Sequence, residues 1–380
     1  MATLGAAGAI SLFAGLQAES QNGKGGPRRI DVHHHFTPAA YAAYQAATGR
    51  GGGARGGARG DGRGAAGGGA GARGPAFGSA FAGWTLSEDL EDMDKNGTAT
   101  AILSITTPGF PGGTAEEKRK VMRECNEAAA KLREEHPDRF GSFAALPMLD
   151  TDGALKEIEY AFDTLKADGI GLFSDYGDVW LGNSRFAPIY EELNRRKAIV
   201  YIHPTAPNCC GNMPLTQEGV PNEGPMIEYG TDTTRTIASL IFSGTTKKFP
   251  NVTFITSHAG GMMPYIVERF FQNGAAAEVV PGVVTKGQGG SKPDLQAGQE
   301  VLHELRKLYY DTAQSSNPVA MGALRKVVPV TQIVFGTDYW YRTAEETGRG
   351  LVTGKVFSDA ELRMINRGNA ERLLPSYKSS

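Results

Sequence analysis

Two histidines with the spacing of metal ligands lie in one short run near the start of the sequence. His33 and His35 are separated by a single residue within DVHHH at 31–35. Because successive side chains of a strand point to opposite faces, we expect His33 and His35 to point the same way and His34 the other way. Two imidazoles on one face can bind a single ion. This run therefore predicts half of a metal site.

Two further candidate ligands close later apolar runs. His203 ends YIH at 201–203, and Asp338 ends FGTD at 335–338. Together with His33 and His35 they form a set of three imidazoles and one carboxylate. Imidazole favours zinc, and mixed sets of this kind also accept manganese. We predict one divalent ion, with zinc preferred and manganese as the alternative.

His258 ends another apolar run but has a different predicted role. Histidine titrates near neutrality, so His258 is predicted to give or take a proton beside the metal, and Asp338 is the second candidate for proton transfer. A fifth metal ligand is the alternative for His258. Asp31 shares the parity of His33 and His35, and we expect it to orient a ligand from behind.

The fold must bring these side chains to one place. Apolar runs rich in β-branched residues alternate with helical patterns, and we expect strands at 30–34, 99–105, 140–146, 169–173, 199–203, 252–256, 307–311 and 332–336. Eight such repeats predict an α/β fold, the (β/α)8 TIM barrel, whose active site lies at the carboxyl ends of the strands. An open doubly wound sheet is the alternative, but no glycine-rich phosphate motif follows the first run.

Composition excludes several classes of protein. The chain has 380 residues, of which 40% are hydrophobic, which is enough for a large core. Lys and Arg number 39 against 41 for Asp and Glu, so no overall field favours nucleic acid or an anionic membrane. Three cysteines do not form a disulfide framework. We expect no nucleic-acid partner and no membrane partner.

Two segments stand outside the predicted barrel, which we place at 29–376. Residues 1–28 form an N-terminal extension whose apolar part resembles an export signal but lacks a preceding basic residue, so both a cytoplasmic and a periplasmic location are open. Residues 49–74 are almost entirely Gly, Ala and Arg, which predicts a disordered loop insertion after the first strand. At that place the loop could act as a lid.

The motifs together resemble the amidohydrolase-2 family, which includes aminocarboxymuconate-semialdehyde decarboxylase and the salicylate-type decarboxylases. The resemblance covers residues 30–375, apart from the glycine-arginine insertion. Its marks are IDVHHHFTP at 30–38, the stretch at 84–104, YIHPTAP at 201–207, SHAGGMMPYIVERF at 257–270, FGTDY at 335–339 and NAERLLP at 369–375. SITTPG at 104–109 and IEYGTDTTRTIASLIFSG at 227–244 most resemble the branch of 6-methylsalicylate decarboxylases.

The resemblance implies a mononuclear metal site in which His33, His35, His203 and Asp338 match the family ligands and His258 the catalytic histidine. Arg269 matches a residue that binds a substrate carboxylate in a neighbouring subunit, which implies at least a homodimer. A second carboxylate-binding arginine of the semialdehyde decarboxylase is replaced by small residues around Ala80. This departure favours a small aromatic monocarboxylate over a dicarboxylate.

The resulting hypothesis is a metal-dependent, non-oxidative decarboxylase of a small aromatic acid such as an ortho-hydroxybenzoate. Candidate contacts for the aromatic ring are Trp84, Phe110, Tyr339 and Trp340, with ordinary packing as the alternative. A metal-dependent hydrolase of a lactone, ester or amide is the competing reaction. A barrel that binds metal and recruits a partner through residues 49–74 is a third hypothesis.

Overall fold

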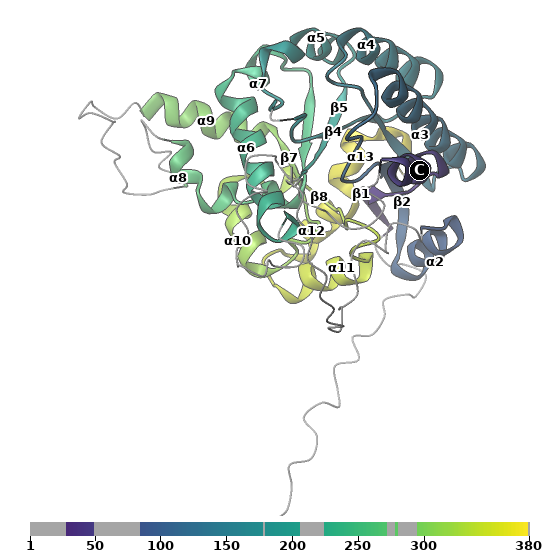
Figure 1. Ribbon diagram of the computed structural model, residues 1–380. Coiled ribbons are helices and arrows are strands. Elements are labelled where there is room, and N and C mark those ends of the chain that lie inside the picture. The colour runs from purple at the N-terminus through teal and green to yellow at the C-terminus, as the bar shows by residue number, and fades with distance from the viewer. Residues whose placement is uncertain are drawn as a thin grey trace, which may run out of the picture.

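The computed structural model describes residues 28–48, 84–177, 179–205, 224–271, 278–279 and 295–378. Eight parallel strands follow one another around a single sheet in chain order. Helices surround the strands on the outside (Figure 1). This arrangement confirms the predicted (β/α)8 barrel.

The strands occur where the apolar runs predicted them. Their bounds are β1 Arg29–His35, β2 Thr98–Ser104, β3 Phe140–Ala145, β4 Gly169–Phe173, β5 Ile199–His203, β6 Thr253–Thr256, β7 Tyr309–Asp311 and β8 Ile333–Val334. The barrel closes because the backbone N–H of Val32 donates to the carbonyl of Phe335 at 3.0 Å, and that of Asp338 donates to the carbonyl of His33 at 2.9 Å.

Strand β8 is shorter than the predicted run of 332–336. Regular strand structure ends at Val334, and Asp338 has a φ of +66°, in the left-handed region. Backbone pairing with β1 nevertheless continues past Asp338, because the N–H of His35 donates to the carbonyl of Tyr339 at 3.1 Å. The segment after β8 therefore stays beside β1 and carries Asp338 to the mouth of the barrel.

The helices form an outer layer around the strands. Their bounds are α1 Ala39–Ala47, α2 Leu86–Asn96, α3 Ala115–Glu135, α4 Thr151–Glu159, α5 Ala187–Arg195, α6 Tyr229–Phe242, α7 Thr245–Lys248, α8 Val267–Phe270, α9 Leu295–Lys307, α10 Pro318–Val327, α11 Ala344–Thr353, α12 Asp359–Arg363 and α13 Asn369–Leu373. α6 and α7 are adjacent in the chain but separate. Gly244 between them has a φ of +75°, which interrupts the helix.

Some predicted features lie outside the described residues. These are the N-terminal extension apart from Arg28, the glycine-arginine insertion at 49–74 and the small residues around Ala80. Among the helices that are described, none is both long and apolar enough to cross a membrane.

Candidate metal centre and active site

Three predicted ligand atoms meet at the carboxyl ends of β1 and β8. His33 Nε2 lies 3.0 Å from His35 Nε2 and 3.2 Å from Asp338 Oδ1, and His35 Nε2 lies 3.0 Å from that same oxygen. Ligands held at about 2.1 Å around one divalent ion are separated by distances of this order. The three side chains are thus spaced as neighbours in one coordination sphere.

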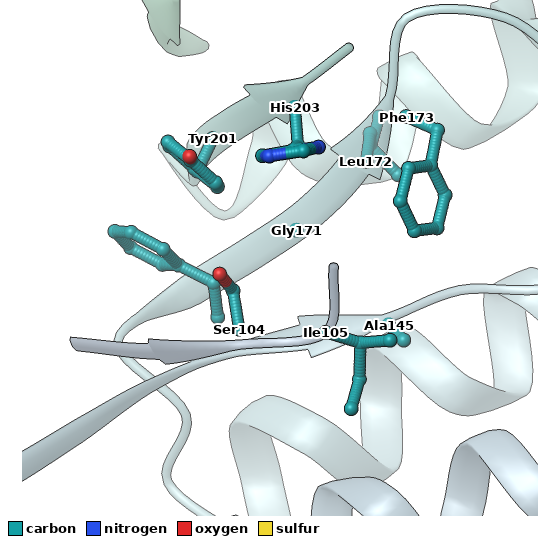
Figure 2. A pocket seen from close by; sticks show the side chains of 9 residues that line it. Ser104, Ile105, Ala145, Gly171, Leu172, Phe173, Tyr201 and His203 are labelled. Carbon is teal, nitrogen blue, oxygen red and sulfur yellow. The ribbon is translucent and has the colours of Figure 1, made fainter. Parts of the chain in front are cut away.

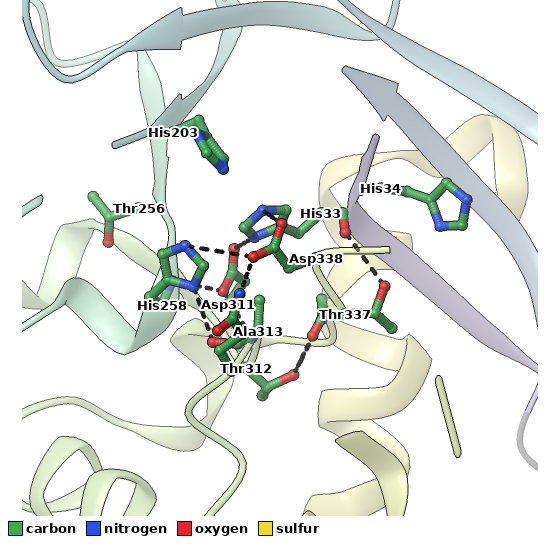
Figure 3. A network of polar contacts seen from close by, with 12 residues as sticks. His33, His34, His203, Thr256, His258, Asp311, Thr312, Ala313, Thr337 and Asp338 are labelled. Atoms are coloured by element: carbon green, nitrogen blue, oxygen red, sulfur yellow. Dashed lines mark hydrogen bonds and ion pairs between the residues drawn. The ribbon is translucent and has the colours of Figure 1, made fainter. Parts of the chain in front are cut away.

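Two more histidines face the same point from β5 and β6. Single ligand atoms of His33, His203, His258 and Asp338 all lie within 4.8 Å of one another. The rings of His35 and His203 are in edge contact, with centroids 4.7 Å apart. Figure 3 shows His33, His203, His258 and Asp338 directed toward a common centre. The fold therefore brings together all five predicted metal-binding and catalytic side chains.

Each imidazole is oriented by a hydrogen bond from its other nitrogen. The Nδ1 of His33 lies 2.7 Å from Asp311 Oδ2. The other three Nδ1 atoms face backbone carbonyls: that of His203 lies 2.8 Å from Pro204, that of His258 3.1 Å from Ala313, and that of His35 3.3 Å from Ser104. A carbonyl or an ionised carboxylate only accepts, so each Nδ1 carries a proton and donates it. The Nε2 atoms are left to face the centre, as metal-bound histidines require.

The ionisation states of the side chains at the centre are those expected of a site that binds a cation. Burial lowers the pKa of both His35 and His203, so these rings are neutral. Burial also opposes a charge on His33, but the carboxylates of Asp311 and Asp338 raise its pKa to about 10. Burial by itself would raise the pKa of Asp338, but the charge and hydrogen bond of His33 hold it well below the usual value.

The donor set consequently fits a divalent metal ion. Without metal, the carboxylates retain a proton on His33 at the place where the ligand atoms meet. Asp338 Oδ1 is buried, and apart from the imidazole nitrogens of His33 and His35 it has no polar partner among the described residues. Three imidazoles and one carboxylate are a ligand set that zinc and manganese both accept.

Strand β7 supplies no ligand, yet its end organises the site. Asp311 is fully buried, and besides His33 it accepts hydrogen bonds from the backbone N–H of His258 at 2.8 Å and of Ala313 at 3.0 Å. The Gln314 amide donates to Asp338 Oδ2. Neither Asp311 nor Gln314 was predicted from the sequence. The signal was present, because Asp311 ends the seventh apolar run just as His203 ends the fifth.

Asp31 braces the site from behind. Its Oδ1 accepts from the backbone N–H of His33 and of Thr337, both at 3.1 Å, and its Oδ2 accepts from the Thr337 hydroxyl at 2.6 Å. These bonds tie β1 to the turn that carries Asp338. The β1–β2 pairing shifts register between Asp31 and His34, but His33 and His35 still share one face of β1 and His34 takes the other.

His34 points away from the centre and into a separate buried network. Its Nδ1 lies 3.0 Å from Asp31 Oδ2 and its Nε2 lies 2.9 Å from Asp89 Oδ1 in α2. The Trp84 indole donates to Asp89 at 3.0 Å, and the Tyr339 ring stacks on His34 with centroids 4.4 Å apart. Two predicted ring contacts, Trp84 and Tyr339, therefore lie on the outer side of β1.

Of the remaining predicted substrate contacts, one lies at the centre and two do not. The ring of Trp340 lies near that of His35, with centroids 6.5 Å apart, so it borders the centre. Phe110 is buried and packs against Tyr41, at 5.3 Å between ring centroids. Arg269 in α8 is exposed and is not among the described side chains that meet at the centre.

Tyr229 borders the centre, although its position there was not predicted from the sequence. Its ring lies 6.4 Å from that of His203, and its hydroxyl is 3.1 Å from Thr107 Oγ1. No pattern distinguished it from other aromatic residues, because it begins helix α6 rather than ending a strand.

Left-handed residues cluster around the same centre. His258, Gln314 and Asp338 have φ values of +52°, +49° and +66°. Such conformations are uncommon for residues other than glycine and concentrate at functional sites. All three follow the strands β6 to β8, where the ligand and proton-transfer groups are carried.

Comparison with known proteins agrees with this site. The family model described as amidohydrolase matches residues 30–376. The 6-methylsalicylic acid decarboxylase of Penicillium expansum is 36% identical, with 92% of this chain and 97% of that protein covered. The gamma-resorcylate decarboxylase of a Rhizobium species is 27% identical, with 75% and 85% covered.

A solved structure shows the same fold at lower identity. The dihydroxybenzoic acid decarboxylase of a Polaromonas species, solved with bound manganese and the inhibitor 2-nitroresorcinol, superposes with a TM-score of 0.69 at 17% identity, covering 92% of this chain and 98% of that one. The family match spans nearly the whole described barrel, and it includes each of the five side chains that meet at the centre. The chain belongs to the amidohydrolase family.

Proposed function

We propose that this protein is a metal-dependent decarboxylase of a small aromatic acid, of the ortho-hydroxybenzoate class. The observation that carries the proposal is the convergence of His33, His35, His203 and Asp338 on one point, with His258 beside them. Relatives named as decarboxylases of 6-methylsalicylic acid and gamma-resorcylate support the reaction and the substrate class.

The bound ion would be held by the three imidazoles and Asp338 Oδ1, and it would act as a Lewis acid toward the phenolic oxygen of the substrate. Decarboxylation requires a proton at the ring carbon that bears the carboxylate. The bond from that carbon to the carboxyl carbon then breaks, its electron pair restores the aromatic ring, and carbon dioxide leaves.

His258 is placed to handle this proton. Its Nδ1 is committed to the Ala313 carbonyl at 3.1 Å, so Nε2 is the nitrogen that exchanges a proton. That nitrogen lies 3.9 Å from Asp338 Oδ2, and the side chain is 11% exposed, toward the mouth. Asp338 Oδ2 already accepts from Gln314. We therefore assign proton transfer to His258, with Asp338 stabilising its charged form.

The aromatic substrate would contact two aromatic side chains that border the centre. Trp340 lies next to His35, and Tyr229 lies next to His203. Apolar walls with a few convergent polar groups are usual for small-molecule sites. We infer that these two rings hold the arene over the metal.

Arg269 is proposed to complete a neighbouring copy of the site. It is exposed on α8, close in sequence to Met262 and Tyr265, which are 45% and 53% exposed. Exposed apolar side chains around an arginine suit a protein–protein contact. A homodimer in which Arg269 binds the substrate carboxylate of the partner site predicts that inactive Arg269→Ala and His258→Ala chains regain activity when mixed.

Zinc is the proposed native metal because imidazole dominates the ligand set, and manganese is the alternative. Elemental analysis of purified protein, together with activity after reloading each ion separately, decides between them.

The central experiment measures carbon dioxide release from hydroxylated and methylated benzoates by metal-stripped protein reloaded with zinc, manganese or magnesium. Metal-dependent release from an ortho-hydroxybenzoate, abolished by Asp338→Asn and by His258→Ala, is the expected result. Turnover of lactones or esters with no release from any acid would contradict the decarboxylase and assign the site to hydrolysis.

A further inference from the structure

A small cavity lies inside the barrel, with the proposed ligand His203 on its wall. It is bordered by the ends of β2 to β5, and the polar residues on its wall are Ser104, Tyr201 and His203 (Figure 2). The centre of a water-sized group can occupy about 10 Å³ within it. This is the minimum space that holds one water molecule.

Two hydroxyl protons on this wall lack an evident acceptor. Tyr201 is 1% exposed, and its Oη has no hydrogen-bond partner among the described residues. Ser104 is 2% exposed, and its Oγ contacts His35 Nδ1 at 3.2 Å. Since that nitrogen donates, Ser104 Oγ acts there as an acceptor and its own proton must point elsewhere. Buried hydroxyl groups are almost always satisfied by protein or by ordered water.

We propose that the cavity binds one ordered water molecule that accepts hydrogen bonds from Tyr201 Oη and Ser104 Oγ. The two lone pairs of the water match the two donors. The cavity, its polar wall and the buried Tyr201 hydroxyl are separate observations that agree on this ligand. Ser104 and Tyr201 are then positioning residues for His35, acting through the water.

His35 is the ligand that needs such support. The hydrogen bonds that orient His33, His203 and His258 are 2.7, 2.8 and 3.1 Å long, whereas Ser104 offers His35 two longer contacts of 3.2 and 3.3 Å. A water that holds the Ser104 proton keeps Oγ available to His35 Nδ1. Groups that orient ligands in this way change metal affinity by about 10- to 100-fold.

The test compares Tyr201→Phe, Ser104→Ala and the double variant with a matched control, Tyr190→Phe. Tyr190 is also 1% exposed with an unpartnered hydroxyl among the described residues, but it lies in α5, its ring packs on Phe249 and Phe254, and it is not on the cavity wall. Zinc affinity is measured by chelator competition, and thermal unfolding is measured on metal-free protein. A high-resolution crystal structure shows the water directly.

We expect Tyr201→Phe and Ser104→Ala each to weaken zinc binding by about 10-fold, the lower end of the range for such groups. The double variant should bind zinc no more weakly than Ser104→Ala, because both changes break one chain. Tyr190→Phe should bind zinc like the unchanged protein. Additive losses, or a Tyr201→Phe variant that behaves like the control, would overturn the proposal.

The inference rests on the proposed metal site, but the experiments distinguish a failure of the inference from a failure of the proposed function. If the unchanged protein binds no zinc or manganese, the proposed function fails while the water is still decided by the crystal structure and by unfolding. Removing a water-bonded hydroxyl lowers the melting temperature of metal-free Tyr201→Phe, whereas removing an unsatisfied hydroxyl raises it. A raised value and a dry cavity would reject the water.

Discussion

Asp311 Oδ2 lies 2.7 Å from His33 Nδ1, which is closer than the partner of any other Nδ1 among the four histidines of the centre. Asp311 also accepts the backbone N–H of His258 at 2.8 Å. One fully buried carboxylate thus fixes both a metal ligand and the proposed proton-transfer residue.

Replacing this carboxylate should weaken the site without removing a ligand. We expect Asp311→Ala to lower zinc affinity by about 10- to 100-fold, because His33 loses the bond that orients it. Chelator competition measures the change. Asp150→Ala serves as a control, since Asp150 caps helix α4 and makes no hydrogen bond to the described side chains of the site. Equal zinc affinity in both variants would show that Asp311 does not orient His33.

Replacing a metal ligand and replacing the proton-transfer residue should have different effects on metal content and turnover. His203→Ala is expected to lose the metal, whereas His258→Ala should retain it and lose about 100- to 10,000-fold in kcat. Metal content by elemental analysis, measured beside turnover, separates the two. Loss of metal from His258→Ala would make His258 a fifth ligand instead.

Metal removal should destabilise the folded protein. Binding to the native state alone stabilises it by about 2.7 kcal/mol at a free metal concentration 100 times the Kd. The melting temperature should therefore rise with zinc concentration and fall on chelation. The ligand variant His203→Ala should show little of this dependence. A zinc-dependent rise as large in His203→Ala as in the unchanged protein would place the stabilising ion elsewhere.

A buried carboxyl near the site should make stability depend on pH. Asp232 in α6 is fully buried, and its Oδ2 accepts from the Ser174 hydroxyl and, at 3.1 Å, from the Thr205 backbone N–H. Burial raises its pKa from 3.8 to about 7; the two hydrogen bonds and the charge of Arg235 oppose the rise, and the charge of Asp175 adds to it.

The direction of this pH dependence follows from the difference in bound protons between the folded and the unfolded state. Between pH 3.8 and about 7 the folded state binds more protons at Asp232 than the unfolded state, so this group makes the free energy of unfolding fall as pH rises. Denaturant unfolding of Asp232→Asn from pH 5 to 8 should show a flatter dependence than the unchanged protein. Parallel curves would mean that Asp232 is ionised throughout.

The turn after His258 should tolerate no side chain at Gly261. Its φ is +65°, and a Cβ there would overlap the carbonyl oxygen of Gly230. We expect Gly261→Ala to lower the free energy of unfolding by about 2 kcal/mol or more. Gly322→Ala in α10, where a Cβ meets nothing within 4 Å, should be neutral or stabilising by up to about 1 kcal/mol. Similar losses in both variants would contradict this reasoning.

The strands and ligands were predictable because local patterns determine them. Five-residue apolar runs such as 169–173 and 199–203 match β4 and β5 to the residue. The ends of parallel strands converge by construction, so polar residues that close those runs had to meet. The extent of β8 was not predictable, because the left-handed turn at Asp338 is stabilised by distant partners such as Asp31 and Gln314.

The direction of the aromatic side chains around the mouth of the barrel was the other feature that could not be predicted from the sequence. Trp84 and Tyr339 adjoin motif residues in sequence, but their rings pack on Phe36 and His34 rather than at the centre. Tyr229 reaches the centre from the start of a helix. Which way an aromatic ring turns depends on long-range packing, and spacing along one chain segment does not contain that information.

The side chains that hold and orient the metal site come almost entirely from β1 and from β5 to β8. Strands β2, β3 and β4 contribute only Ser104 to it. The loops that follow these three strands can therefore be replaced without exchanging a side chain that holds the metal. Redesign of substrate specificity should begin at these loops.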